Sequence, residues 1–438
     1  MKGLLLNSPI YRERSEFNED YLPPLGLGYI ATHLSDSGIN VNIVDCVKER
    51  YGISEILELL REQQPEFMGI NVFTQNYDIV KEIVENCPIG ITLIIGGQVV
   101  KNIYADILQW DIENPLIIII GEGEFILPAI LNSNCSELPF HKTSKKEVYR
   151  VDKSSIYYPR DLRLVHLDRS KLKEDVVTNH YGEKEASLIT SRGCLYNCAF
   201  CGGAHNLNRD ITIRHRNLSD VEHEIYEITS LYPEVTSIRV LDDLFLRDEI
   251  SINNAIEMFG KLQHLSWRGM AHILTFVRSF DSIPQLKQNG CREIFVGIES
   301  GSERIRKKIH KPGTVQQIED IVLELLRSGI DVKGYFMFGF PNETVADAEA
   351  TYLLASRLKK IACEEMGQFR LSVFQFRPYH GTELYNEILQ SGRKISSIKS
   401  NETLNVVSGR SQFNFHSGNY SEIDDNALDE YILKTQSL

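Results

Sequence analysis

The segment Cys194-Leu-Tyr-Asn-Cys198-Ala-Phe-Cys201 brings three thiols together at gaps of three and two residues. Thiols at this spacing can hold one face of a metal cluster. Iron–sulfur clusters and structural zinc usually take four protein ligands, so three is one too few for a closed site. The triad therefore predicts a cluster with one iron open to a substrate or cofactor. The alternatives are a zinc site completed by a distant His or Cys, and three unrelated buried thiols.

Composition indicates a globular protein of two or three domains. The chain has 438 residues, of which 42% are hydrophobic and 24% are charged. Its formal net charge of −13 argues against a nucleic-acid or anionic-membrane partner and favours a small-molecule substrate. No apolar run reaches the roughly 18 residues of a membrane span, and the short apolar start is no signal peptide. We expect a cytoplasmic protein, because a reducing compartment suits free thiols and an oxygen-sensitive cluster.

Residues 1–135 alternate between short apolar runs and helical segments. This alternation predicts a doubly wound parallel sheet of Rossmann type, which binds ligands at the carboxyl ends of its strands. The loops at those ends offer small residues and backbone amides to a bulky ligand, although tight turns need glycine in any case. There is no G-x-G-x-x-G motif that opens a helix, so a dinucleotide site is not expected. The expected strands cover residues 3–7, 41–45, 67–73, 92–95 and 116–120.

A second α/β series follows a polar segment. Residues 136–185 lose the alternation and are predicted to be a linker, and residues 186–385 regain it. Six strand–helix units are fewer than the eight of a closed barrel, so we predict an open, partial (β/α)6 barrel. Residues 386–438 are expected to form a C-terminal loop and a short helix at 425–433. The expected barrel strands cover residues 188–191, 237–241, 271–276, 293–298, 332–338 and 370–374.

The cysteine triad follows Arg192-Gly193 and has the aromatic Phe200 before its last cysteine. In this form it resembles the signature of radical S-adenosylmethionine (SAM) enzymes. The resemblance implies that Cys194, Cys198 and Cys201 are the metal ligands of a 4Fe-4S cluster whose fourth iron binds SAM. It implies that Phe200 lies at the cofactor. An electron from a donor such as flavodoxin or ferredoxin then splits SAM into methionine and a 5′-deoxyadenosyl radical, which abstracts hydrogen from the substrate.

Other segments resemble the same family. Gly297-Ile-Glu-Ser-Gly-Ser302 is similar to a strand-end motif that contacts SAM, which makes Glu299 and Ser300 candidate cofactor contacts. The same stretch also fits a helix cap. Asp242 and Asp243 stand where many members have Gly-Gly-Glu, and they are candidates for binding the methionine amino group, or else water or the next helix. The segments 334–344 and 375–382 resemble the strand that encloses the adenosyl group and the exit of the final strand.

The paired aspartates are typical of the branch with an N-terminal cobalamin-binding domain. The segment Pro23-Pro24-Leu-Gly-Leu-Gly28-Tyr-Ile-Ala31 resembles a segment of that domain. The Asp-x-His-x-x-Gly motif is absent and His33 lies within a predicted helix, so cobalamin would be bound without a lower axial histidine. A sheet that has lost its cofactor is the alternative. By this resemblance the candidate cobalamin contacts are Asn7, Gly96, Gly97, Gly121 and Glu122.

The leading hypothesis is a cobalamin-dependent radical SAM methyltransferase. It would methylate an unactivated carbon, or phosphorus, of a specialised metabolite. The alternatives are a cobalamin-independent radical deoxygenase, dehydratase or rearrangement enzyme, for example on an amino sugar, and a zinc-stabilised binding protein without catalysis. Tyr335 and Arg377 are the candidate catalytic residues because they lie near strand ends of the second series. His205, Arg214 and Arg278 share that placement and are weaker candidates.

Overall fold

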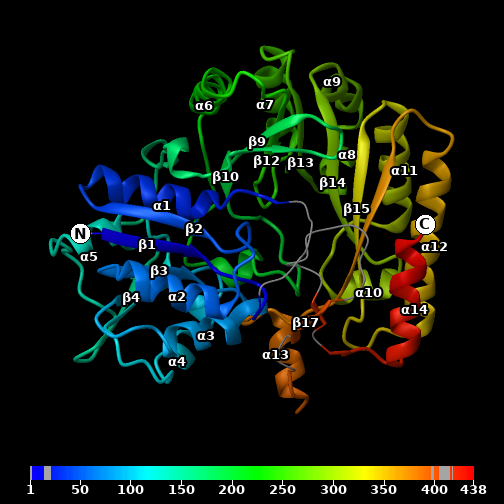
Figure 1. The fold of residues 1–438 in the computed structure, drawn as a ribbon. Coiled ribbons are helices and arrows are strands. Elements are labelled where there is room, and N and C mark those ends of the chain that lie inside the picture. The colour runs from blue at the N-terminus through cyan, green and yellow to red at the C-terminus, as the bar shows by residue number, and fades with distance from the viewer. Residues whose placement is uncertain (1, 14–20, 396–398, 404–414, 417) are drawn as a thin grey trace.

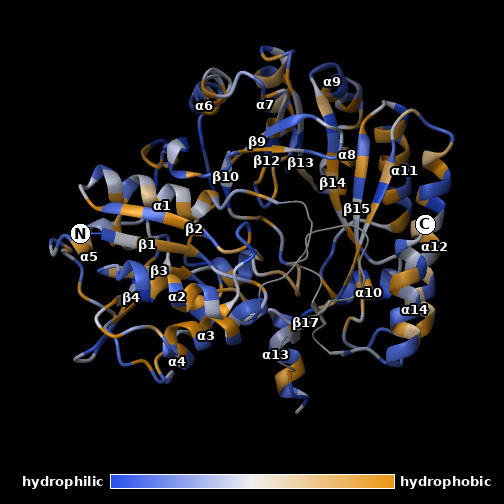
Figure 2. Ribbon diagram, viewed as in Figure 1, coloured by the Kyte–Doolittle hydropathy of each residue, from blue (hydrophilic) through white to orange (hydrophobic). Residues whose placement is uncertain are grey.

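The computed structural model contains two seven-stranded sheets that lie next to each other, each covered by helices (Figure 1). Hydrophobic residues concentrate on the strands and on the helix faces turned toward them (Figure 2). No helix in the described residues is long and apolar enough to span a membrane. Part of the predicted C-terminal loop, 404–414 and 417, lies outside the described residues. The structure describes residues 2–13, 21–395, 399–403, 415–416 and 418–438.

The first sheet is doubly wound, as predicted. Its order is β2-β1-β3-β4-β5-β7-β6, and every neighbouring pair is parallel except β6 with β7. Helices α1 and α5 pack on one face, and α2, α3 and α4 pack on the other. The strands are β1 (Lys2–Asn7), β2 (Asn40–Asp45), β3 (Phe67–Asn71), β4 (Thr92–Gly96), β5 (Leu116–Gly121), β6 (His141–Lys142) and β7 (Lys146–Val151). The helices are α1 (Leu25–Asp36), α2 (Ile53–Gln63), α3 (Tyr77–Glu85), α4 (Val100–Ile107) and α5 (Ile126–Leu131).

The segment 136–185 is more than the linker expected from its polarity. Strands β6 and β7 extend the first sheet, and β8 (Val176–Thr178) adds to the second. On β7, Val148, Tyr149 and Val151 are buried, whereas Lys146, Glu147 and Arg150 are charged. Charged residues protect a sheet edge from pairing with other chains, and here they hid the strand from a hydrophobicity pattern.

The second sheet is a curled half-barrel. Six parallel strands follow in sequence order, β9, β12, β13, β14, β15 and β16, and β8 pairs antiparallel with β9. Their helices cover the outer face, and the C-terminal α14 (Asp425–Gln436) packs beside α12 over β16 (Figure 1). The strands are β9 (Lys184–Leu188), β12 (Ser237–Val240), β13 (Ser266–Ala271), β14 (Cys291–Glu299), β15 (Asp331–Phe338) and β16 (Phe369–Gln375). The outer helices are α6 (Leu218–Leu231), α7 (Glu249–Gly260), α9 (Ile283–Gln288), α11 (Val315–Arg327) and α12 (Val345–Ala362).

Short elements connect these units. They include β10 (Ser191–Arg192), β11 (Arg214–His215), α8 (Ile273–Arg278), α10 (Glu303–Lys308), α13 (Glu383–Gln390), β17 (Lys399–Thr403) and β18 (Phe415–His416).

Two predicted strands are misplaced. The run 271–276 is mostly the helix α8, which begins where the His272 side chain accepts a hydrogen bond from the Leu274 amide. The true strand β13 precedes it and carries a fully buried charge, Arg268, which breaks the apolar pattern. Likewise the strand expected at 188–191 is β9, which starts at Lys184 and contains the buried Glu185.

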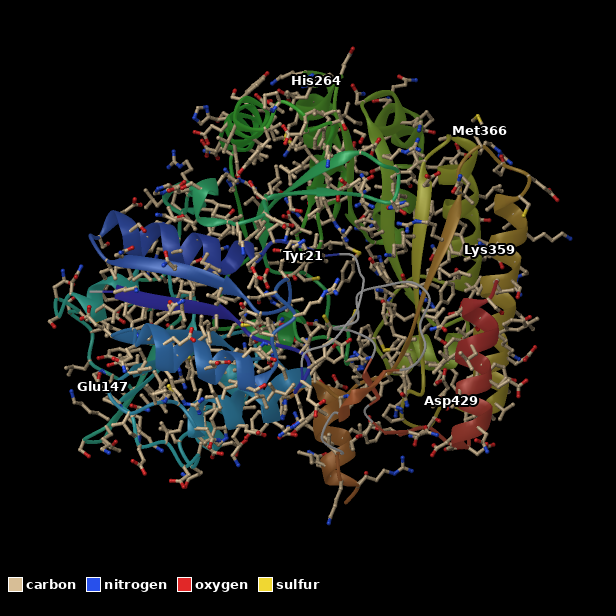
Figure 3. All side chains as sticks on the ribbon, in the orientation of Figure 1. Tyr21, Glu147, His264, Lys359, Met366 and Asp429 are labelled. Atoms are coloured by element: carbon tan, nitrogen blue, oxygen red, sulfur yellow. The ribbon has the colours of Figure 1, made fainter. Side chains whose placement is uncertain are left out.

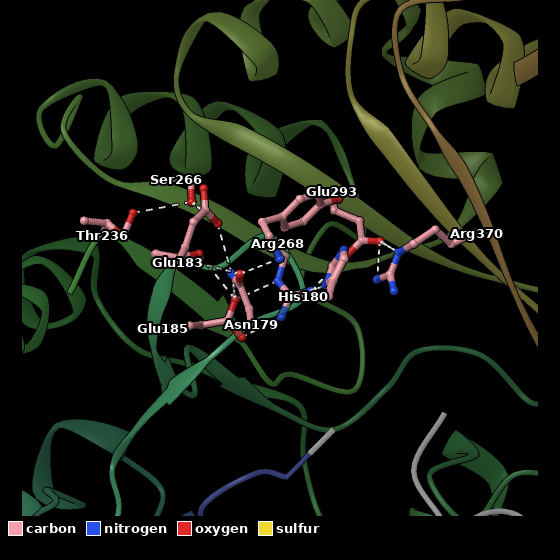
Figure 4. A network of polar contacts seen from close by, with 11 residues as sticks. Asn179, His180, Glu183, Glu185, Thr236, Ser266, Arg268, Glu293 and Arg370 are labelled. Carbon is pink, nitrogen blue, oxygen red and sulfur yellow. Dashed lines mark hydrogen bonds and ion pairs between the residues drawn. The ribbon is translucent and has the colours of Figure 1, made fainter. Parts of the chain in front are cut away.

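These two charges belong to one buried network (Figure 4). Arg268 donates to both oxygens of Glu185, at 2.5 and 2.6 Å, and to Glu293 at 2.9 Å. Arg370 donates to the other oxygen of Glu293 at 2.5 and 2.8 Å. Charged side chains are almost never fully buried unless paired, so the network explains how the strands β9, β13, β14 and β16 can carry charge inward.

Replacing Arg268 by Met will destabilise the half-barrel, because Glu185 then keeps a buried charge without its guanidinium. We expect a loss of about 3–5 kcal/mol in the free energy of unfolding. Urea unfolding can be followed by the fluorescence of Trp267, which is buried in the barrel, in a Trp110→Phe background. The control Arg357→Met, which removes an exposed arginine paired with Glu319, will lose at most about 1 kcal/mol. An equally small loss for Arg268→Met would contradict the role given to the network.

Candidate functional site

A cavity of about 660 Å³ opens where the carboxyl ends of the first sheet meet the second domain. The first domain contributes the expected residues to its lining: Asn7, Gly96, Gly97, Gly121 and Glu122. The other wall comes from the second domain and includes Ile189, Arg192 and Leu241. None of the described lining residues is a histidine. The lining is mostly apolar, as in cofactor sites, and the cavity belongs to both domains.

Three glycines keep the strand ends open. Gly97 has φ of 121°, and a Cβ there would lie 2.5 Å from the Val72 carbonyl oxygen. Gly121 has φ of 102°, and its Cβ would lie 2.2 Å from the Val151 oxygen. Gly96 differs, because a Cβ there would meet no atom within 4 Å. Gly97 and Gly121 are therefore required by the turns, whereas Gly96 leaves space on the cavity side.

Asn7 is held at the end of β1. Its side-chain amide donates to Asp45 at 2.7 Å, and its oxygen accepts from Asn71 at 3.2 Å. Tyr21, labelled near the centre of Figure 3, donates to the other oxygen of Asp45 at 2.7 Å. Because these bonds fix Asn7 between β2 and β3, it forms a preset polar edge of the cavity.

Glu122 joins the two domains. It accepts hydrogen bonds from Arg214 at 2.7 and 2.8 Å and from Arg192 at 2.8 Å. Glu124 also pairs with Arg192 at 2.8 Å. Burial alone would raise the pKa of Glu122, but the guanidinium groups of Arg214 and Arg192 outweigh it and lower that pKa. The carboxylate is therefore ionised at neutral pH and holds the second domain against the cavity.

The cysteine triad follows directly from Arg192. Cys198 is buried, Cys194 and Cys201 are partly buried, and none forms a disulfide. Burial raises the pKa of all three thiols, to about 12 for Cys201, so a bound metal is needed to hold them as thiolates at neutral pH. In the described part of the chain the three sulfur atoms are not all within 4.8 Å of one another.

Backbone contacts hold this loop from both sides. The Ala199 amide donates to the Ile309 carbonyl, and the Ala199 carbonyl accepts from the Leu384 amide, each at 3.0 Å. The ring of Phe200 packs 5.8 Å from that of Phe340. Phe200 therefore anchors the loop to the end of the barrel through an apolar cluster, a role that accounts for its position without a cofactor contact.

The paired aspartates have different surroundings. Asp242 accepts from the Thr190 amide at 2.7 Å and from the hydroxyls of Thr190 and Ser191 at 2.5 and 2.6 Å. Its carboxylate thus ties the end of β12 to the segment before the triad, and its expected contact with the cofactor stays a prediction. Asp243 is exposed and lies beside the triad: a Cβ on Gly203 would be 3.8 Å from its carboxyl group and 3.6 Å from the Cys201 sulfur.

The neighbouring residues Glu299 and Ser300 make different contacts. Ser300 is fully buried, and its hydroxyl lies 3.0 Å from that of Thr351 on α12, so it has a packing role, while its expected contact with the cofactor stays a prediction. Glu299 pairs with Lys311 at 3.1 Å. Burial alone would lower the pKa of Lys311, but Glu299 and the nearby Cys198 outweigh it and raise that pKa. Lys311 was not foreseen, because a lysine after a short helix carries no sequence signal.

The substrate-side candidates lie apart. Tyr335 faces into the half-barrel, with its ring 6.1 Å from that of Phe374. Arg377 is buried beside Tyr379, and burial lowers its pKa to about 10. Arg214 belongs to the pairing with Glu122. The remaining two, His205 and Arg278, are exposed.

Two models of known protein families match separate segments of the chain. Residues 188–355 match the radical SAM superfamily, and residues 19–131 match the B12 binding domain. These matches confirm the resemblance predicted from the sequence. The chain therefore contains a radical SAM domain preceded by a B12 binding domain.

Two curated relatives cover most of the chain. An uncharacterized methyltransferase of Pyrococcus horikoshii is 29% identical over 83% of this chain and 78% of its own. Cytidylyl-2-hydroxyethylphosphonate methyltransferase of Streptomyces wedmorensis is 25% identical over 84% of this chain and 78% of its own. Among solved structures, the radical SAM methyltransferase TsrM of Kitasatospora setae, with cobalamin and a [4Fe-4S] cluster bound, has a TM-score of 0.65 at 16% identity. It covers 99% of this chain and 90% of its own.

Replacing Glu122 by Gln will weaken the contact between the domains by about 3 kcal/mol at pH 7, because Arg214 loses its carboxylate partner. The pKa of Glu122 is lower in the folded state than in the unfolded chain. Its contribution is therefore complete above the ordinary carboxyl pKa, about 4.3, and is lost as the pH falls through the lowered folded value. Thermal unfolding of the wild type and Glu122→Gln measured from pH 7 to pH 3 will show a difference in Tm that shrinks below about pH 4. A difference that grows toward acid pH would contradict this sign.

Proposed function

We propose that the chain is a cobalamin-dependent radical SAM methyltransferase that methylates an unactivated carbon, or phosphorus, of a small specialised metabolite. One observation carries the proposal: the apolar cavity of the B12-binding domain and the cysteine triad share a wall. Arg192 provides it, since this residue pairs with Glu122 at the cavity and lies two residues before Cys194. A methyl carrier and a radical source placed so close together fit a reaction that needs both.

The described residues fit the proposed cofactors. Cys194, Cys198 and Cys201 would hold a 4Fe-4S cluster, which with SAM supplies the radical chemistry. Asp243, Glu299 and Lys311 border the triad and would orient the amino and carboxylate groups of SAM. Asn7, Gly96, Gly97, Gly121 and Glu122 would border cobalamin, bound without an axial histidine.

The remaining residues shape the substrate side. Tyr335 would pack against a substrate inside the half-barrel, and Arg377 would hold Tyr379 beside Cys201. An electron donor such as flavodoxin or ferredoxin would reduce the cluster. The apolar cavity wall would exclude water, which protects a radical from side reactions. A cytoplasmic location belongs to the same proposal, because a reducing compartment keeps the triad free for iron.

Protein reconstituted anaerobically with iron, sulfide and cobalamin should convert its substrate to a product one methylene heavier, with the methyl group coming from SAM. Label from SAM with a trideuterated methyl group will appear in the product, as mass spectrometry can show. Omission of cobalamin should abolish this product and leave 5′-deoxyadenosine formation in place.

The matched control is Cys194→Ala, which should lose cluster iron and all cleavage of SAM while retaining cobalamin. Two outcomes would contradict methyl transfer and favour radical deoxygenation or dehydration. The product would form equally well without cobalamin, or it would have lost water instead of gaining a methylene. A colourless protein that binds zinc in place of iron would exclude the radical reaction altogether.

Replacing Gly96 by Leu will block cobalamin, because the side chain enters space where a Cβ meets no other atom. Overfilling of this kind costs roughly 1–3 kcal/mol, which corresponds to about a 10- to 100-fold loss of cobalamin affinity. Equilibrium dialysis with hydroxocobalamin measures it. Gly96→Ala is the matched control and should bind within a fewfold of the wild type. Unchanged binding by Gly96→Leu would place cobalamin elsewhere.

A further inference from the structure

The inner face of the half-barrel carries a buried cation, Arg239, that none of its described residues neutralises. Residues on each strand alternate between the helix-covered outer face and the concave inner face. Glu185, Glu293, Arg268 and Arg370 point inward near the start of the strands and neutralise one another (Figure 4). The next inward positions include two more cations, Arg239 on β12 and Lys333 on β15, each 5% exposed.

Arg239 has no acidic partner. Among the described residues its guanidinium forms no hydrogen bond or ion pair, and its Nε is completely buried without a partner. Its one recorded contact is with the ring of Phe295, whose centroid lies 5.1 Å from the guanidinium carbon. A buried guanidinium normally pairs with a carboxylate, because removal of its hydration is otherwise uncompensated. Arg239 is thus a buried cation that lacks an anion.

Its neighbours also have unused polar groups. Ser187 stands opposite Arg239 on the adjacent strand β9, and its hydroxyl is buried without a partner among the described residues. Phe295 lies 6.5 Å from Tyr335, ring to ring, and the Lys333 ammonium lies 5.7 Å from the Tyr335 ring. The surface therefore combines a cation, a hydroxyl and aromatic rings, which is the usual composition of a small-molecule site.

Arg239 and Ser187 lie one inward position below residues that line the cavity between the domains. Leu241 and Ile189 line that cavity, and each directly follows the end of its strand, two residues after Arg239 and Ser187 respectively. Two residues of strand span about 7 Å, so Arg239 lies roughly that far below the cavity floor. A small molecule whose reacting atom faces the cavity could reach Arg239 with a group a few bonds away.

We propose that Arg239 is the receptor for an anionic group, a phosphate, phosphonate or carboxylate, of the substrate. The group would sit between Arg239 and Ser187 at the inner face, with Phe295 and Tyr335 beside the substrate body. The guanidinium fork matches the two oxygens of such an anion. This assignment rests on the proposed function only because it calls the ligand a substrate. The affinity of the site for an anion can be measured without turnover.

The test measures anion binding by the reconstituted holoenzyme, without reductant and with saturating SAM so that the SAM site is filled. Inorganic phosphate, methylphosphonate and succinate are titrated separately in thermal-shift and calorimetric assays. At least one of the three should raise the Tm of the wild type, and Arg239→Gln should bind that anion about tenfold or more weakly. The anion that binds distinguishes a phosphoryl group from a carboxylate. Arg357→Gln, which makes the same change on the outer surface, should bind it like the wild type.

Stability without ligand separates this role from a structural one. Arg239→Gln removes an uncompensated buried charge and should leave the Tm of the ligand-free protein unchanged or raised, in contrast to Arg268→Gln. Arg239→Lys keeps the charge but not the fork and should bind the anion with intermediate affinity. The proposal is overturned if none of the three anions binds in an Arg239-dependent manner, or if Arg239→Gln lowers the Tm as much as Arg268→Gln. Failure of methyl transfer with intact anion binding would count against the proposed function alone.

Discussion

The pairing of Glu122 with Arg192 and Arg214 is the interaction on which the rest of the site depends. Glu122 belongs to the first domain and both arginines belong to the second, and all three side chains are largely removed from solvent. Parallel sheets bind ligands at the carboxyl ends of their strands. A contact at those ends therefore places the ligand-binding edge of the first sheet opposite that of the half-barrel. The same contact fixes the residue that leads into the cysteine loop. This ion-pair group therefore holds the cavity and the metal ligands in a fixed relative position.

The half-barrel supplies the complementary constraint. Its lower interior is closed by the Arg268 network, in which charges are neutralised, whereas the level above it holds Arg239 without a counter-charge. The two levels of the barrel interior therefore differ: the base is closed and neutral, and the level above it carries an uncompensated cation. In the proposed arrangement the substrate enters from the cavity side, and Arg239 binds its anionic group before the group reaches the base. Six strands instead of eight leave room for the first domain to complete the wall.

Sequence patterns predicted the fold class, the strands β1 to β5 of the first sheet and the triad, because these rest on uninterrupted apolar runs and on local spacing. They failed where charge is buried: β13 and β9 were misplaced because Arg268 and Glu185 interrupt the hydrophobic pattern and are neutralised only by residues far along the chain. The same limit applies to single site residues. Asp242 and Ser300 matched motif positions, yet their oxygen atoms bond to Thr190, Ser191 and Thr351. Lys311 gave no signal, since only the fold brings it to Glu299.

The central claim is that one gap between two sheets contains both the cobalamin site and the cluster site. Anomalous scattering from crystals of the anaerobically reconstituted protein, recorded at the cobalt and iron edges, tests it most directly. One cobalt peak should lie in the cavity bordered by Gly96, Gly121 and Leu241, with no histidine nitrogen bound to it, and the iron peak should lie at Cys194, Cys198 and Cys201. Cobalt found outside this cavity, or iron absent from the triad while the protein is active, would contradict the claim.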